Sequence, residues 1–143
     1  MLFMNKFRFV IDTNVVFEGL TKKNSAPGIL IDSWLAGLFD VYISNALAYE
    51  YSDVLSRKLS SRRWNTLKPV LGTLLSKCNF TKIYYSWRPN SQDPNDDHVI
   101  DCAMNSSATL ITFNRKDFKN AINFLDLQVM SPVEALIMLA NEG

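Results

Sequence analysis

The sequence is poor in the residues that build covalent cross-links and soft-metal sites. It has two cysteines, Cys78 and Cys102, and one histidine among 143 residues. Two cysteines are too few for a disulfide framework, and no spacing typical of a zinc site is present. Because Cys102 lies within an apolar helical pattern, we expect reduced thiols in a cytoplasmic protein.

Long apolar runs are missing too. The first one ends at Asp12 after a few residues, which is shorter than the apolar region of a signal peptide, and no segment approaches membrane-spanning length. We therefore expect a soluble protein without a membrane partner. With 48% hydrophobic and 20% charged residues, 143 residues suffice for a real core. The expectation is a single domain over residues 1–143.

Acidic residues are absent between Asp53 and Asp93, whereas eight of the 15 basic residues fall there. Such a charge-segregated segment could track a phosphate backbone, and Trp64 within it could stack on a base. A solvated helix face explains the same pattern equally well. The candidate nucleic-acid contacts are Arg57, Arg62, Arg63 and Lys68.

Strand and helix patterns alternate along the chain. Strands are expected over 7–11, 39–44, 81–85, 108–113 and 127–130. Helices are expected over 26–38, 45–59, 96–107, 115–121 and 131–143, and over 62–78 with interruptions at Pro69 and Gly72. Ser44 and Ser131 are the expected caps of two helices, and 91–97 is expected to be a loop. Alternating strands and helices predict an α/β fold with a parallel sheet covered on both faces.

The first strand ends on a carboxylate, because the apolar run before Asp12 is followed by Thr13 and Asn14. A buried carboxylate is costly unless something compensates it, so Asp12 either caps a turn or holds a cation. In an open parallel sheet, the carboxyl ends of the strands form the edge where ligands bind. Asp12 is predicted to lie at that edge.

Three other polar residues are predicted at the same edge. Glu50 falls on the apolar stripe of its helix, Asp97 opens the helix over 96–107, and Asn114 follows a strand. Acids that converge without matching cations favour a hard ion such as Mg²⁺ or Mn²⁺. The chemistry that follows is hydrolysis of a phosphodiester by a metal-activated water. His98 has no identifiable Ser or Cys partner, so a triad enzyme is disfavoured and a surface position is the simplest interpretation.

The choice of Asp97 depends on the helix register. Asp93 precedes Pro94 and is predicted to be the N-cap, and Asp96 is then placed to complete a capping box. Asp97 lies three residues before Ile100 and continues the core stripe to the helix start. An error of one residue in the boundary would exchange Asp96 and Asp97.

Five segments together resemble the PIN-domain family of ribonucleases. They are "VIDTNVV", Glu50 within its helix, "DPNDD", "LITFNRKDF" and "VMSPVEAL", in that order along the chain. Within the family, the chain is most similar to the toxins of toxin and antitoxin systems. The resemblance implies a three-layer α/β/α fold, often dimeric, with a Mg²⁺ or Mn²⁺ site of three or four acids that cuts single-stranded RNA.

Carried over by position, the resemblance makes Asp12, Glu50 and Asp97 the three metal-binding acids. Thr112 and Asn114 lie where many members have a threonine and a fourth acid, and Asn114 weakens any claim to a second tightly held ion. Thr13 and Asn14 would support the first acid. The implied partners are single-stranded RNA, an antitoxin protein and a second copy of the chain.

Two other functions compete with this interpretation. A haloacid dehalogenase-like phosphatase would need a second aspartate two residues after Asp12, where this chain has Asn14. A PIN-like fold that binds RNA or protein without cutting is disfavoured because the three principal acids are present.

Overall fold

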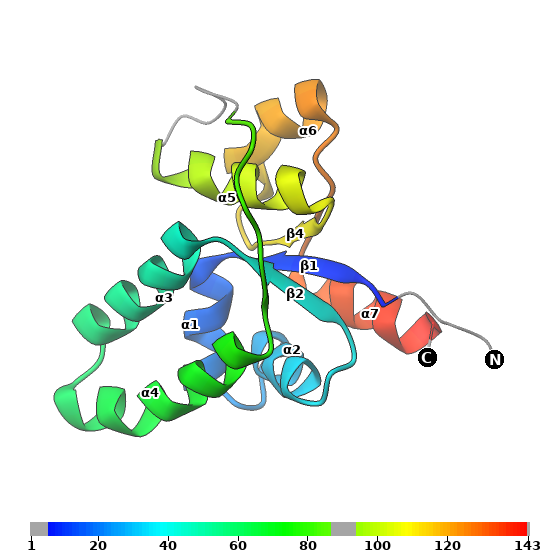
Figure 1. Ribbon diagram of the computed structural model, residues 1–143. Coiled ribbons are helices and arrows are strands. Elements are labelled where there is room, and N and C mark those ends of the chain that lie inside the picture. The colour runs from blue at the N-terminus through cyan, green and yellow to red at the C-terminus, as the bar shows by residue number, and fades with distance from the viewer. Residues whose placement is uncertain (1–5, 87–93, 143) are drawn as a thin grey trace.

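The computed structural model describes residues 6–86 and 94–142 (Figure 1). In these residues five parallel strands form one sheet in the order β3-β2-β1-β4-β5. The strands are β1 (Arg8–Ile11), β2 (Asp40–Ile43), β3 (Asn79–Phe80), β4 (Thr109–Ile111) and β5 (Val129–Met130).

Helices cover both faces of the sheet. Helices α5 (Pro94–Ser106) and α6 (Lys119–Leu125) lie on one face, and α1 (Thr13–Thr21), α2 (Ala26–Leu35) and α7 (Pro132–Glu142) lie on the other (Figure 1). The short helix η1 (Arg115–Phe118) leads into α6. Helices α3 (Asn45–Lys58) and α4 (Ser61–Ser76) pack on each other at one side of the molecule. The predicted three-layer α/β/α fold is confirmed.

The core is built around β1, the middle strand of the sheet. Phe9, Val10 and Ile11 are fully buried, because helices cover both faces of this strand. On the neighbouring strand β4, Leu110 and Ile111 are buried in the same way. Within the described parts of the chain, no helix is long and apolar enough to cross a membrane.

Helix α1 was not predicted from the sequence. Asp12 supplies its N-cap, and the amides of Val15 and Val16 donate to the Asp12 carbonyl at 3.0 and 3.2 Å. Val15, Val16 and Leu20 are buried at helical spacing. The first turns of this helix contain the β-branched residues Thr13, Val15 and Val16, which favour strands over helices, and packing of this face overrides that preference.

The predicted strand over 81–85 is wrong. The strand at this edge is β3, which consists of two residues, and the chain from 81 to 86 has no regular secondary structure. The amides of Tyr84 and Tyr85 donate to the side-chain oxygen of Asn105, at 3.0 and 3.2 Å, instead of to a neighbouring strand. A side chain from α5 therefore satisfies backbone amides that a neighbouring strand would otherwise bind.

The predicted interruption at Pro69 and Gly72 is also wrong, since α4 continues through both residues. Pro69 lacks the amide that would donate to the carbonyl of Asn65. Both residues are exposed, so water can satisfy that carbonyl. On the opposite face Leu71 and Leu74 are buried and hold the helix against the core.

The two predicted caps are present. The hydroxyl of Ser44 accepts from the Leu47 amide at 3.2 Å at the start of α3. At the start of α7, the Ser131 hydroxyl accepts from the Glu134 amide, and the Glu134 carboxylate accepts from the Ser131 amide, which is a complete capping box. The predicted cap at Asp93 lies outside the described residues.

Gly28 allows α2 to pack against the preceding loop. A Cβ added there would lie 2.3 Å from the carbonyl oxygen of Lys23 and 2.5 Å from that of Lys22. We expect Gly28→Ala to lower the free energy of unfolding by about 1–3 kcal/mol through overpacking. Gly72 in α4 has nothing within 4 Å of such a Cβ, so Gly72→Ala should instead raise stability by up to about 1 kcal/mol. Urea midpoints measure both changes, and equal midpoints for the two variants would contradict this packing.

Candidate active site

The register between β1 and β4 places two polar side chains next to each other at the carboxyl edge of the sheet. Ile11 pairs with Ile111, and the amide of Asp12 donates to the carbonyl of Ile111 at 2.9 Å. Asp12 and Thr112 are therefore the first residues beyond the ends of adjacent strands. The Thr112 hydroxyl donates to Oδ2 of Asp12 at 2.7 Å.

The other carboxylate oxygen of Asp12 faces the start of α1. Oδ1 accepts from the Thr13 amide at 2.9 Å, and the carboxylate lies at the helix N-terminus, where the helix dipole favours a negative charge. Asp12 is thus the N-cap of a helix, whereas the sequence predicted that it caps a turn or holds a cation. Capping leaves the second role open, because a carboxylate that accepts hydrogen bonds still has lone pairs for a cation.

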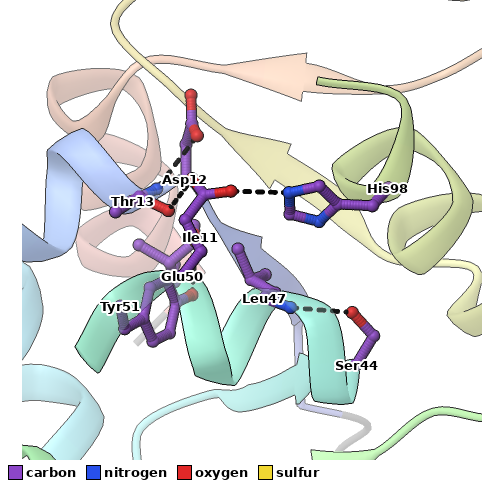
Figure 2. A network of polar contacts seen from close by, with 8 residues as sticks. All are labelled: Ile11, Asp12, Thr13, Ser44, Leu47, Glu50, Tyr51 and His98. Carbon is purple, nitrogen blue, oxygen red and sulfur yellow. Dashed lines mark hydrogen bonds and ion pairs between the residues drawn. The ribbon is translucent and has the colours of Figure 1, made fainter. Parts of the chain in front are cut away.

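Glu50 reaches this site from α3, and two hydrogen bonds hold its carboxylate (Figure 2). The Thr13 hydroxyl donates to Oε1 at 2.5 Å, and Nε2 of His98 lies 2.6 Å from Oε2. Thr13 therefore connects the two acids, since its amide contacts Asp12 and its hydroxyl contacts Glu50. His98 brings α5 into the same network.

Tyr51 anchors α3 beneath the two acids. Its hydroxyl donates to the carbonyl of Ile11, the last residue of β1 (Figure 2). The side chain is fully buried, and burial raises the pKa of Tyr51 well above its ordinary value. Tyr51 thus remains a neutral donor, and it fixes the position of α3 one residue away from Glu50.

The environments of the two acids shift their pKa values in opposite directions. Burial raises the pKa of Asp12, and the hydrogen bonds from Thr112 and the Thr13 amide offset only part of that effect. Burial also acts on Glu50, but the hydrogen bonds from His98 and Thr13 outweigh it and lower the pKa. Pairs of acids with divergent environments are common at functional sites. At Asp12 the negative charge remains under-compensated.

The remaining predicted site residues differ in how deeply they are buried. Asp97 is buried on α5, one residue before His98, whereas Asp96 is half-buried. The backbone amide of Asn114 donates to the Thr112 hydroxyl at 3.1 Å, and Asn114 is exposed. Asn14 is exposed on the first turn of α1.

The predicted nucleic-acid contacts lie on α3 and α4, apart from the two acids. Arg57 is exposed in the last turn of α3 and pairs with Asp53 at 3.0 Å. Trp64 on α4 is partly buried against the core. Arg62, Arg63 and Lys68 are exposed on α4, so both the nucleic-acid interpretation and the solvated-face interpretation remain open.

The side chains at this point of the site, those of Asp12, Glu50, Thr13 and Thr112, carry oxygen atoms only, and oxygen ligands suit Mg²⁺ or Mn²⁺. Among residues 6–86 and 94–142, no group of three or more acidic, histidine or cysteine side chains is arranged to hold a metal ion. Mg²⁺ commonly uses only one or two protein carboxylates and completes its shell with water and phosphate oxygens. Asp12 and Glu50 therefore fit such an ion, with Asp97 as a candidate third ligand.

Comparison with known proteins places the chain in a family. The pattern described as the PIN domain matches residues 8–116, which includes β1, all of α3 and α5, and β4. The chain belongs to the PIN domain family. No curated protein sequence matches it significantly.

Solved structures share this PIN fold at low sequence identity. FitAcB from Neisseria gonorrhoeae is 22% identical, with a TM-score of 0.63, over 87% of this chain and 97% of that one. VapBC2 from Rickettsia felis is 17% identical, with a TM-score of 0.63, over 87% and 98%. PAE2754 from Pyrobaculum aerophilum is 14% identical, with a TM-score of 0.64, over 94% and 90%. These likenesses support the PIN fold.

Sequence reasoning missed one member of this PIN-domain site. His98 was predicted to be a surface residue, but its side chain is only 21% exposed and contacts Glu50. Its position directly after a buried acid, in the first turns of a helix that opens at the ligand-binding edge, was the available signal. The role of Tyr51 had no signal, because its partner is a backbone carbonyl 40 residues earlier.

The Thr112 hydroxyl is the link between β4 and the site. It donates to Asp12 and accepts from the Asn114 amide. Thr112→Val keeps the shape but leaves a buried oxygen of the Asp12 carboxylate without its donor, so we expect a loss of about 1–3 kcal/mol in the free energy of unfolding. Thr109→Val, at the start of β4, is the matched control and should change stability much less. Equal denaturation midpoints for the two variants would contradict the network.

Proposed function

We propose that this PIN-domain protein is a Mg²⁺- or Mn²⁺-dependent endoribonuclease that cuts single-stranded RNA. One observation carries the proposal. The buried carboxylate of Asp12 lies at the carboxyl edge of the sheet, connected through Thr13 to a second carboxylate, and its raised pKa reflects a charge that the protein alone does not fully compensate. A divalent cation would supply that compensation.

Asp12, Glu50 and Asp97 are the proposed ligands, and Asn114 is the proposed fourth residue of the catalytic set. When bound, the ion would lower the pKa of an attacking water and neutralise charge on the phosphate. The chain's own residues hold the ligands in position. Thr112 and the Thr13 amide orient the two oxygens of Asp12, and His98 holds Glu50. No nucleophilic side chain is needed.

The biological role proposed for this activity is that of a toxin restrained by an antitoxin protein, with the chain acting as a homodimer. The resemblance of the sequence motifs to PIN-domain toxins supports this role. The solved structure of VapBC2, which is bound to a DNA fragment from its promoter, shares the fold of this chain. A short reading frame next to the gene would support an antitoxin partner.

A second candidate function is RNA or protein binding without cleavage. It is favoured because the described residues contain no group of three or more acidic, histidine or cysteine side chains arranged to hold a metal ion. The two functions differ in one measurable property, because only the nuclease requires a bound cation.

Asp12→Asn tests the nuclease directly. We expect RNA cleavage with Mn²⁺ to fall by orders of magnitude while the fold is kept, since asparagine preserves the shape and can still accept from the Thr13 amide. The melting temperature in metal-free buffer should rise slightly, because a buried, under-compensated charge is removed. Mn²⁺ should raise the melting temperature of the wild type but not that of the variant.

Asp32→Asn is the matched control, because Asp32 is exposed on α2. It should leave both cleavage and the response to Mn²⁺ unchanged. Asp97→Asn should behave like Asp12→Asn if Asp97 is the third ligand. Undiminished cleavage by Asp12→Asn would refute the site.

The exposed cations of α4 allow a test of RNA binding. Replacing Arg62, Arg63 and Lys68 by alanine should weaken RNA binding. Each lost phosphate contact should lower the slope of log K against log salt by roughly 0.7 for a single strand. Binding titrations at several salt concentrations measure the slope. An unchanged slope would show that these residues do not contact the RNA and form a solvated helix face instead.

A further inference from the structure

We propose that the segment 79–86 forms the wall of a groove that binds the bases of single-stranded RNA beside the two acids. This inference rests on the proposed function and identifies where the substrate lies. It starts from two surface hollows that share three residues of this segment, namely Phe80, Thr81 and Lys82.

The segment follows α4 and runs beside β2, with which its strand β3 pairs (Figure 1), and both hollows adjoin it. The first, of about 580 Å³, is lined by the start of α3 at Ser44 and by His98 and Asp101 of α5. The second, of about 450 Å³, is lined by Arg8, Tyr42, Tyr84 and Asn105. Each has the volume of a typical ligand site. Because Phe80, Thr81 and Lys82 line both, we take the two hollows together as the proposed groove.

The groove wall is held at two points. The Thr81 amide donates to the Ile43 carbonyl at 2.8 Å, which continues the pairing of β3 with β2. Further along, Asn105 accepts from the amides of Tyr84 and Tyr85 and donates to the Tyr85 carbonyl at 2.9 Å. These bonds order the backbone before any ligand binds, so little ordering entropy remains to be lost on binding.

Exposed aromatic rings line this ordered wall. Phe80 is 59% exposed and Tyr84 is 77% exposed. Their exposure is not needed for the fold, since large apolar side chains gain stability from burial. Aromatic rings on a held backbone are the platform on which single-stranded bases stack, and such stacking accepts any base.

The charges of the groove fit a phosphate backbone. Lys82 borders both hollows. Arg8 is held in place, because its Nη1 donates to the Ser106 carbonyl at 2.9 Å and its guanidinium lies 4.7 Å from the centre of the Tyr42 ring. Asp101 is the only acid among the described residues that line the two hollows, and it is buried. The exposed charge in the groove is therefore positive.

The groove leads to the proposed catalytic acids. His98 lines the first hollow and contacts Glu50 through Nε2. Figure 2 shows His98 and Ser44 on the same side of Glu50, so an RNA strand that enters along the segment reaches the acids past the imidazole ring. The first turn of α3, which borders this hollow, carries no acidic side chain that would repel it.

The test measures binding of a labelled single-stranded RNA of mixed sequence to the Asp12→Asn protein, which should not cut it. Phe80→Ala and Tyr84→Ala should each raise Kd about 5- to 100-fold, as expected for the loss of one stacked base. Tyr84→Phe keeps the ring and should bind like the parent. Phe124→Ala is the matched control, because Phe124 is 78% exposed on α6, away from the groove. Lys82→Ala should lower the salt slope by roughly 0.7.

An unchanged Kd for RNA in both Phe80→Ala and Tyr84→Ala would overturn the groove. If these variants also showed weaker self-association or weaker protein binding, the aromatic surface would belong to a protein interface instead. Cleavage by the otherwise unaltered protein separates this inference from the proposed function. If that protein cuts RNA, Phe80→Ala should raise KM with little change in kcat, and an unchanged KM refutes the groove alone. If it cuts no RNA while Phe80→Ala weakens binding, the groove stands and the nuclease is refuted.

Discussion

The pairing of β1 with β4 is the constraint on which the site depends. The bond from the Asp12 amide to the Ile111 carbonyl fixes where β1 ends, and the same register brings Thr112 beside the Asp12 carboxylate. Side chains alternate between the faces of a sheet, so a slip of one residue would exchange the two faces of the strand that slips. The start of α1, and with it Thr13, would then lose its position relative to Glu50.

Burial of carboxylates at this edge explains the polar side chains around them. Each buried oxygen needs a donor, and three elements supply one: β4 through Thr112, α1 through Thr13 and α5 through His98. These donors more than offset the burial of Glu50 but not that of Asp12. The fold thus tolerates an under-compensated negative charge at one point, which is the property expected where a cation binds.

The segregation of charge along the sequence becomes a separation in space. The acids of the proposed site occupy the carboxyl edge of the sheet, while the candidate cations occupy the outer faces of α3 and α4 and the groove beside segment 79–86. This arrangement suits a substrate that must be held near acids, because the cations offset the repulsion between acids and phosphates.

Local chemistry by itself determined much of this protein. The alternation of apolar runs and amphipathic segments predicted a parallel sheet in an α/β fold. Ser44 and Ser131 predicted where two helices begin. Asp12 and Glu50 were assigned to one edge of the sheet from their places in this pattern. Each of these depends on short-range periodicity or on a cap a few residues away.

Only the tertiary structure decided the remainder. Residues 13–21 are helical because their apolar face packs against the core. Helix α4 continues past Pro69 because Leu71 and Leu74 on its other face are buried. Segment 81–86 does not extend the sheet, and the Asn105 side chain accepts from its Tyr84 and Tyr85 amides. His98 meets Glu50 across 48 residues of sequence. Contacts between residues so far apart depend on how the layers dock, and no local pattern encodes that docking.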